Sequence, residues 1–569
     1  MSLTSVSARA RVIRRREVLG LAAVLVCAAL VLPPLWTLLK GSIIADDGSG
    51  WTLGNFAALL QSRGLAQAAV NSIVFSFFSM VLSLALGGSV AWLVERTDVP
   101  MKKLAWLTTI VSLGTPFIVY VAAWVFLFGR SGPINDAYRL VTGSNGTLVE
   151  ISTMYGMVLV EGLLWTPLCF LLLSATFRAS NAEMEEAARM SGASVSEAVR
   201  LISMKLARPA ILALALFIFV LNLEAFEVPA LVGMPGGINI LTTEIYRSVK
   251  EIPPRMGYAS SFSVVMLVIV SVLLYFYGRI SKQAERYATI TGKGYRPRLL
   301  RLGRWRRWCS LIIVANFLLV LFLPLCAMIW IASLQFLQPM RLGALKTLTL
   351  HNFETVLTSP YYYGLVVNTL IVAAIAATVT MALTFVTGWI AARRRPWGQA
   401  IDQLVAVPLV FPGIVLGVAM LELALGLPIP LYGTLWILTL AFVIHYLPFG
   451  MRYTYSGVLQ IHAELEQAAA VSGANTREMM LRVVAPLLAP ALASGWLFIF
   501  LLSSKEMSLP LLLAGPRSQT IAVAMFDLWG NGQLGEVAAL GLLWAALMTL
   551  AGVAFYVFSR RQSAATFGG

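Results

Sequence analysis

Polar and ionisable side chains occur inside two long apolar runs of the sequence, where they are the residues best placed for chemistry within a membrane. They are Asn222, Glu224 and Glu227 in "FVLNLEAFEVPAL", and Ser503, Ser504, Lys505 and Glu506 in "FLLSSKEMSLPLL". A charge near the centre of a bilayer costs about 2.5–3.5 kcal/mol on insertion scales, so such residues usually serve a function. We expect these side chains to line or gate a pathway through the membrane. The alternative is a polar cluster that fastens two parts of the protein together.

Glu224 and Lys505 occupy matching positions in the two runs, and we expect them to form an ion pair. No other combination of residues indicates a metal site or a catalytic site. The histidines (His351, His445 and His462) have no neighbouring metal ligands, so no metal or cofactor is expected. The segment "ERYATITGKGY" has Tyr287 and Gly294 where a phosphate-binding G-x-x-x-x-G-K-[ST] loop needs Gly and Ser or Thr. We therefore expect neither an ATP site nor an enzymatic activity in this chain.

A polar, alanine-rich segment occurs twice, as "EEAARMSG" and "EQAAAVSG". Its residues are Glu185, Glu186, Ala187, Ala188 and Gly192 in the first copy, and Glu466, Gln467, Ala468, Ala469 and Gly473 in the second. Alanine favours helix and glycine ends it, and a capping pair follows each glycine (Ser194 with Glu197, Asn475 with Glu478). The pattern predicts a short helix, a sharp turn and a second helix. Such an element, repeated on one face, suits insertion into a groove on a partner protein.

The elements that carry these residues are transmembrane helices. The chain has 569 residues, of which 59% are hydrophobic and 12% charged, whereas a soluble protein carries about a quarter charged residues. About twelve apolar runs reach the length of about 20 residues that a spanning helix needs. The sequence therefore predicts an all-α polytopic membrane protein. The expected spans lie near 18–43, 66–94, 104–128, 153–178, 207–232, 257–279, 308–334, 362–391, 402–427, 433–458, 490–514 and 533–558.

The twelve spans form two tandem repeats of six. Pro167 and Pro448, and Gly192 and Gly473, are each 281 residues apart (473 − 192). We predict a first repeat at 1–279 with its polar loop at 180–209, a basic linker at 280–307, and a second repeat at 308–569 with its loop at 461–490. An even number of spans per repeat implies a pseudo-two-fold axis along the membrane normal.

The net charge of +16 does not indicate nucleic-acid binding, because the basic residues cluster at the ends of apolar spans. Lys and Arg in short loops mark the cytoplasmic side, which places both termini, the linker and both polar loops inside the cell.

The doubled segment resembles the coupling loop of ABC importer permeases, E-A-A-x-x-x-G. "EAARMSG" is followed by "KLARPAI", and "QAAAVSG" by "VVAPLLAPAL". The resemblance covers nearly the whole chain and implies two fused permease domains in a bacterial inner membrane. It implies two copies of a cytoplasmic ABC ATPase as partners, together with an external substrate-binding protein. Gln467 departs from the motif, and Lys205 stands where the second half has Pro486, so we expect the two docking sites to differ.

Within that family the chain looks most like permeases of the ferric-iron, thiamine, aminoethylphosphonate and polyamine group, and ferric iron is the favoured substrate. An ion-coupled secondary carrier, which also uses twelve spans in two repeats, is the alternative from another class. It would not account for the doubled polar segment.

Overall fold

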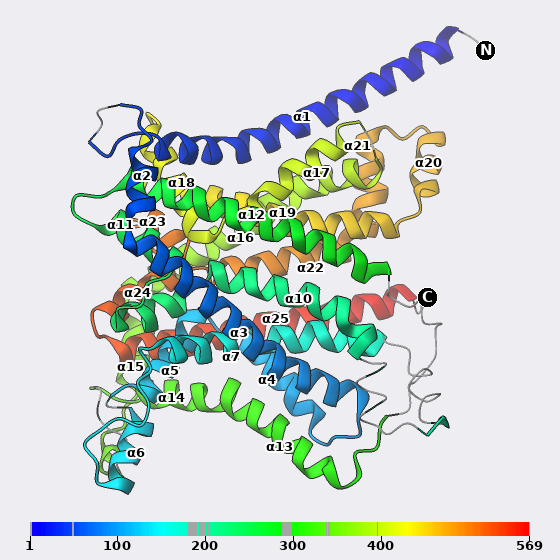
Figure 1. Ribbon diagram of the computed structural model, residues 1–569. Coiled ribbons are helices and arrows are strands. Elements are labelled where there is room, and N and C mark those ends of the chain that lie inside the picture. Colours follow the sequence, from blue (N-terminus) through cyan, green and yellow to red (C-terminus); the bar gives the residue numbers. More distant parts are fainter. Residues whose placement is uncertain are drawn as a thin grey trace.

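The computed structural model describes residues 3–47, 50–130, 132–179, 190–192, 197, 201, 204–286, 299–336, 338, 342–394 and 396–567. Within these ranges the chain is helical, and its long helices run side by side as a bundle (Figure 1). Eleven helices in the described ranges are long and apolar enough to cross a membrane, or twelve if one bent pair counts as a span. The predicted all-α polytopic membrane fold is confirmed.

The first half begins with a long helix and ends at the linker. Its helices are α1 (Leu3–Ser42), α2 (Gly54–Gln61), α3 (Arg63–Arg96), α4 (Lys102–Gly114), α5 (Phe117–Phe128), α6 (Pro133–Thr142), α7 (Met154–Ala179), α10 (Met204–Glu224), η2 (Pro229–Gly233), η3 (Met234–Gly236), α11 (Leu241–Lys250) and α12 (Met256–Arg286).

The second half follows the same order. Its helices are η4 (Gly303–Trp305), α13 (Arg306–Phe317), η5 (Leu318–Phe322), α14 (Leu323–Ala332), η6 (Leu342–Thr347), α15 (His351–Thr358), α16 (Pro360–Ala392), α17 (Gly398–Ala406), η7 (Val407–Val410), α18 (Gly413–Gly426), α19 (Leu435–Gln460), α20 (Ala463–Val471), α21 (Thr476–Met479), η8 (Met480–Val484), α22 (Ala485–Ser503), α23 (Pro510–Leu513), α24 (Ile521–Gly530) and α25 (Leu534–Phe567).

Equivalent hydrogen bonds in the two halves confirm the repeat. Asn55 Nδ2 donates to the carbonyls that end α1, and Asn352 Nδ2 does the same at the end of α14. Each amide lies against a glycine at the start of its half's sixth span, Gly257 or Gly535, where a Cβ atom would meet the amide nitrogen at 2.5 or 2.6 Å. These glycines therefore permit a close approach that any side chain would prevent.

Four predicted spans are broken, which the sequence analysis did not foresee. In span 3, α4 ends before Pro116 and α5 follows, and in span 9 the axes on either side of Pro412 differ by 104°. Span 5 was predicted to continue to 232 and span 11 to 514, but α10 ends at Glu224 and α22 at Ser503. Proline lacks the amide hydrogen that continues a helix, and the charged residues that follow α10 and α22 need partners other than hydrocarbon.

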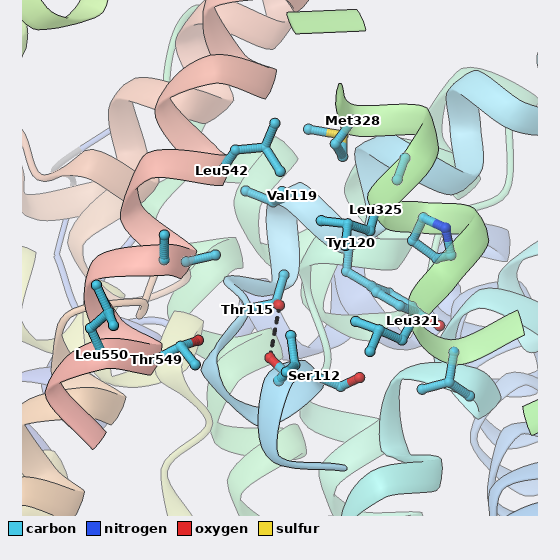
Figure 2. A pocket seen from close by; sticks show the side chains of 16 residues that line it. Ser112, Thr115, Val119, Tyr120, Leu321, Leu325, Met328, Leu542, Thr549 and Leu550 are labelled. Atoms are coloured by element: carbon cyan, nitrogen blue, oxygen red, sulfur yellow. Dashed lines mark hydrogen bonds between the residues drawn. The ribbon is translucent and has the colours of Figure 1, made fainter. Parts of the chain in front are cut away.

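The first span of each half packs against the other half. α1 contacts α12 of its own half but also α17 and α18 of the second, where Thr37 Oγ1 donates to the carbonyl of Ala419 at 3.1 Å. Likewise α14 contacts α5 of the first half as well as α25. A cavity of about 460 Å³ remains at this second contact, between α4, α5, η5, α14 and α25 (Figure 2). The two halves are therefore interlocked and share one core.

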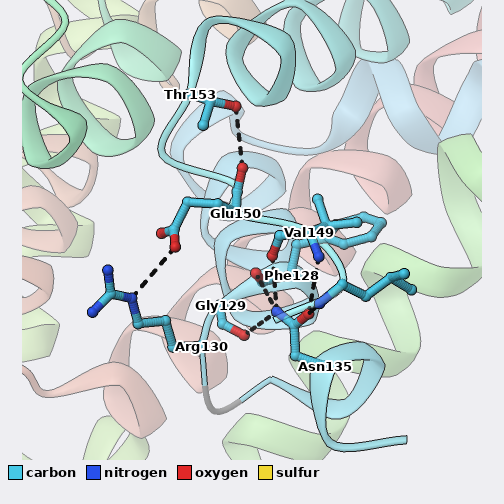
Figure 3. Close-up of polar contacts among 8 residues, drawn as sticks. Phe128, Gly129, Arg130, Asn135, Val149, Glu150 and Thr153 are labelled. Atoms are coloured by element: carbon cyan, nitrogen blue, oxygen red, sulfur yellow. Dashed lines mark hydrogen bonds and ion pairs between the residues drawn. The ribbon is translucent and has the colours of Figure 1, made fainter. Parts of the chain in front are cut away.

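The loop after α5 has a structure of its own that only the first half carries at this length. Asn135, at the start of α6, donates to the carbonyls of Phe128, Gly129 and Val149 at 2.9–3.0 Å, and its Oδ1 accepts from the amides of Leu148 and Val149 (Figure 3). The buried side-chain amide of Asn135 thus binds the segment before α6 and the segment after it. In the second half, only residues 427–434 connect α18 to α19.

Candidate functional site

The second copy of the polar segment folds as a helix, a turn and a second helix, at the end of the bundle opposite α11 and α24 (Figure 1). α20 ends at Val471, and Gly473 has a φ of +89°, which residues with a side chain rarely adopt. Asn475 and Glu478 cap α21 reciprocally, each side chain bonded to the other's backbone amide at 3.0 Å. The predicted shape of this copy is confirmed.

In the first copy, Gly192 has a matching φ of +91°. Glu185, Glu186, Ala187 and Ala188 lie outside the described residues.

Glu466 is an internal anchor. Its Oε1 accepts a hydrogen bond from Arg393 Nε at 2.7 Å, and Arg393 Nη2 donates to the carbonyl of Ile461 at 2.8 Å. The Glu466 side chain is only 7% exposed and that of Arg393 only 14%. Sequence reasoning placed Glu466 in a surface that binds a partner and missed Arg393, which stands directly after α16. Glu466 instead holds α20 against the bundle.

An exposed apolar side chain lies at the tip of the element formed by α20 and α21. Val471 is 90% exposed and precedes the turn at Gly473 by two residues. Met190 has the same place before Gly192 and is also 90% exposed. Both halves therefore present one large apolar side chain at the same position, while Gln467 and Ala468 are exposed along α20. Sequence reasoning missed Met190 and Val471, although their spacing of 281 residues (471 − 190) gave the signal.

A polar cluster, formed by Glu161, Glu224, Glu227, Lys505 and Glu506, lies in the interior between the halves. The Glu227 carboxylate lies beside Ser508, and these two residues occupy equivalent positions 281 apart (508 − 227). Equivalent positions meet only where the pseudo-two-fold axis passes. The contact therefore places the cluster on that axis, where the halves of a transporter commonly form their pathway.

Lys505 is bound to the broken span of the opposite half. Its Nζ donates to the carbonyl of Leu113 at 2.9 Å, near the end of α4, and lies 4.6 Å from the centroid of the Phe117 ring. A helix C-terminus offers unpaired carbonyls and partial negative charge, which suit an ammonium group. Among the described residues no ion pair joins Lys505 to Glu224, so the expected pair is not formed. Lys505 finds the end of α4 instead, because α4 stops inside the bundle.

Glu506 turns toward the broken span of its own half. Its Oε1 accepts from the amide of Leu509 at 3.4 Å and lies 3.2 Å from the position that a Cβ atom would take on Gly413, the first residue of α18. A helix N-terminus favours a carboxylate. Lys505 thus binds span 3 of one half, and the adjacent Glu506 lies against the start of α18 in span 9 of the other.

The other predicted pathway residues are engaged in helix packing. Asn222 is fully buried and donates to the carbonyl of Ser76 at 3.2 Å. Ser503 and Ser504 are buried and donate to carbonyls of their own helix, at 2.7 and 2.9 Å. By contrast, Glu224, Glu227, Lys505 and Glu506 keep part of their surface exposed. Of the predicted pathway residues, three are therefore buried in helix packing and four are partly exposed.

Glu161 belongs to the polar cluster although sequence reasoning did not select it. It lies in α7, is 3% exposed, and accepts from Trp165 Nε1 at 2.8 Å. Trp165 in turn packs against Phe117, the ring under Lys505. A lone carboxylate in the apolar run "LVEGLLW" was the available signal. Within the described part of the chain, no group of three or more His, Cys, Asp or Glu side chains is arranged to hold a metal ion.

Three aromatic side chains lie between the halves beside the polar cluster. Phe226 directly precedes Glu227, and its ring centroid is 5.2 Å from that of Tyr246 in α11 and 6.3 Å from that of Phe526 in α24. Tyr246 and Phe526 meet edge to face at 6.2 Å. Because α11 and α24 are equivalent helices, this aromatic cluster (Phe226, Tyr246 and Phe526) also lies at the junction of the two halves.

Comparisons with known proteins agree with this architecture. Over 510 residues, covering 88% of this chain and 72% of the relative, the sequence is 24% identical to the ferric transport system permease protein FbpB of Actinobacillus pleuropneumoniae. It is 25% identical to the probable ABC transporter permease protein y4fN of Sinorhizobium fredii, over 89% of both chains. Identity to the putative 2-aminoethylphosphonate transport system permease protein PhnV of Salmonella typhimurium is 26%, over 28% of this chain and 63% of the relative.

A family match covers both halves. Residues 86–286 and 384–564, together more than half of the chain, match the family described as "Binding-protein-dependent transport system inner membrane component". Each matched range includes one copy of the polar segment and some of the residues of the interior polar cluster. The chain therefore belongs to this family of ABC transporter permeases, as two permease domains fused in one polypeptide.

Proposed function

We propose that this protein is the membrane subunit of an ATP-driven importer that receives its substrate from an external binding protein. In this proposal, α20 and its counterpart in the first half bind two copies of a cytoplasmic ATPase subunit, and the chain itself binds no nucleotide. The termini and both polar loops then face the cytoplasm. The observation that carries the proposal is the element of α20 and α21, repeated in sequence, with an exposed apolar side chain at the tip of each copy.

Transport then follows from motion of the two interlocked halves about their common axis. ATP binding draws the ATPase subunits together, and the anchored α20 transmits that motion to α16 through Arg393 and Glu466. The aromatic cluster closes the end of the pathway at α11 and α24, and the polar cluster lines it below. Substrate passes when the aromatic rings separate, as alternating access requires.

Ferric iron is the substrate that we favour, because relatives that match most of the chain are described as ferric transport permeases. 2-Aminoethylphosphonate is the second candidate, since a described relative of part of the chain carries that name. Thiamine and polyamines remain further alternatives within the same type of importer. Uptake of each solute into proteoliposomes that contain the complex and its binding protein distinguishes them.

The docking role is tested by placing a charge at the tip of each element. Val471→Asp and Met190→Asp should each reduce co-purification of the ATPase subunit, and together abolish it, because a carboxylate cannot enter an apolar groove without losing its hydration. Leu140→Asp, at an exposed site on α6, is the matched control and should leave co-purification unchanged. Full co-purification with the double variant would contradict the proposed docking.

A further inference from the structure

We infer that the cavity between the halves is a binding site for one acyl chain of a bilayer phospholipid. Figure 2 shows the cavity, which α4 and α5 line from the first half, and η5, α14 and α25 from the second. Its walls are formed almost entirely by apolar side chains, including Val119, Leu321, Met328 and Leu542. Among the described residues, no helix fills it.

The position of the cavity in the spans indicates an occupant from the membrane. Its lining residues in α25, from Leu542 to Leu550, lie about 12–24 Å from the start of that helix at a rise of 1.5 Å per residue. This depth falls within a hydrocarbon layer of about 30 Å. Leu325 and Leu550 line the cavity and are also exposed on the outer surface of the bundle. The cavity is therefore continuous with the surface that meets lipid.

The size and chemistry of the cavity fit a single hydrocarbon chain. Its volume of about 460 Å³ is about three times that of a cavity that accepts benzene. Apolar cavities of this kind stay free of water. An empty space of this volume would also forfeit the dispersion contacts of every side chain that lines it. A flexible acyl chain that enters from the side restores those contacts.

Three positions that line the cavity carry smaller side chains than their counterparts in the other repeat. Pro116 matches Pro412, so Thr115 corresponds to Phe411. Gly535 matches Gly257 through their equivalent asparagine contacts, so Ala545 and Ala546 correspond to Leu267 and Val268. Three large side chains in one repeat thus stand where three small ones line the cavity.

A bound acyl chain would contact the part of α4 that Lys505 of the other half also binds. Ser112 and Thr115 line the cavity, and Leu113, whose carbonyl accepts from Lys505, lies between them in the sequence. The acyl chain and Lys505 therefore support the same break in span 3. A lipid here acts as a structural part of the interface between α4, α14 and α25.

The test uses the full complex in liposomes that contain a phospholipid with a photoactivatable diazirine in its acyl chain. Mass spectrometry should find adducts on the peptides that contain Val119 and Met328, which line the cavity and are buried. The variant Thr115→Phe/Ala545→Leu/Ala546→Val, which borrows each side chain from the other repeat, should reduce that labelling several-fold. Labelling of the peptide with lipid-exposed Leu25 in α1 should stay unchanged.

The reverse variant, Phe411→Thr/Leu267→Ala/Val268→Ala, should create labelling on the opposite side of the protein. It keeps the test decisive if the filled variant fails to fold. Equal labelling at Val119 and Met328 in the wild type and the folded filled variant would overturn the inference. So would labelling of the reverse variant that matches the wild type.

Discussion

The hydrogen bonds of Arg393 determine where α20 sits. The Glu466 carboxylate that the sequence motif brings to this position is turned inward, onto the end of α16, and the outward face is left to Gln467, Ala468 and Val471. Arg96 precedes its polar loop at the position that Arg393 holds in the second half, and Glu185 corresponds to Glu466. We expect the same anchor in the first half. The function of each of these glutamates would then be to position the helix that carries it.

We predict that Arg393→Ala releases α20. Removing one partner of a buried ion pair costs about 3–5 kcal/mol, because the other charge is left without compensation. Coupled ATPase activity should fall strongly, while the double variant Arg393→Met/Glu466→Met should recover part of it. Limited proteolysis after residue 460 and ATPase assays of the reconstituted complex measure both effects. A double variant as impaired as the single one would argue against an anchoring role.

Lys505 is expected to link the halves during transport. A hydrogen bond from a charged donor contributes about 1.5–3 kcal/mol. Lys505→Met should therefore shift the equilibrium between the two states of the proposed alternating access about tenfold or more. We expect substrate uptake to fall while ATP hydrolysis continues. Lys505→Arg retains charge and donors and serves as the matched control. Uptake that is equal in both variants would show that the bond to the Leu113 carbonyl has no role.

At the scale of elements, the loop that contains α6 depends on one side chain. Asn135 satisfies three carbonyls and two amides, and each buried polar group left unpaired costs about 1–3 kcal/mol. Asn135→Leu should therefore unfold the segment from 129 to 150 without unfolding the spans. Faster hydrogen exchange confined to this segment would confirm the prediction. Asn145→Leu, at an exposed position in the same loop, should leave exchange unchanged.

The breaks in spans 3 and 9 show why the polar cluster can exist inside a membrane. Each break leaves a helix end within the bundle; Lys505 binds the end of α4, and the Glu506 carboxylate lies close to Gly413 at the start of α18. A continuous helix would have satisfied its own carbonyls and amides and offered nothing to a charged side chain. The interrupted helices and the charged residues therefore depend on each other.

For the whole molecule, the interlocked halves and the aromatic cluster predict that motion about the axis opens the pathway. In a background without the four native cysteines, a short bis-methanethiosulfonate reagent should crosslink the pair Tyr246→Cys and Phe526→Cys, since the ring centroids of the native side chains are 6.2 Å apart. The crosslink should abolish substrate uptake, and a reductant should restore it. Each single variant is the control. Uptake at the wild-type rate in the fully crosslinked protein would contradict a gate at this position.

The interlocking of the halves also follows from non-local packing. α1 belongs to the first half by sequence but packs on α17 and α18, and α14 packs on α5. Hydropathy alone identifies these helices as spans and says nothing of their neighbours, because every face of a spanning helix is apolar. The core that results extends across both repeats.

The sequence by itself determined the class of fold, the number of spans, the repeat, and the helix, turn and helix around Gly473. These features depend on local properties: apolar length, capping residues, and a glycine that permits positive φ. Only the tertiary structure decided that Lys505 binds the end of α4 instead of Glu224, that Glu466 is an anchor, and that Glu227 meets Ser508 on the axis. The physical reason is that a side chain's partner depends on which helix ends and faces the fold brings within about 3 Å, and hydrogen bonds act only at that range.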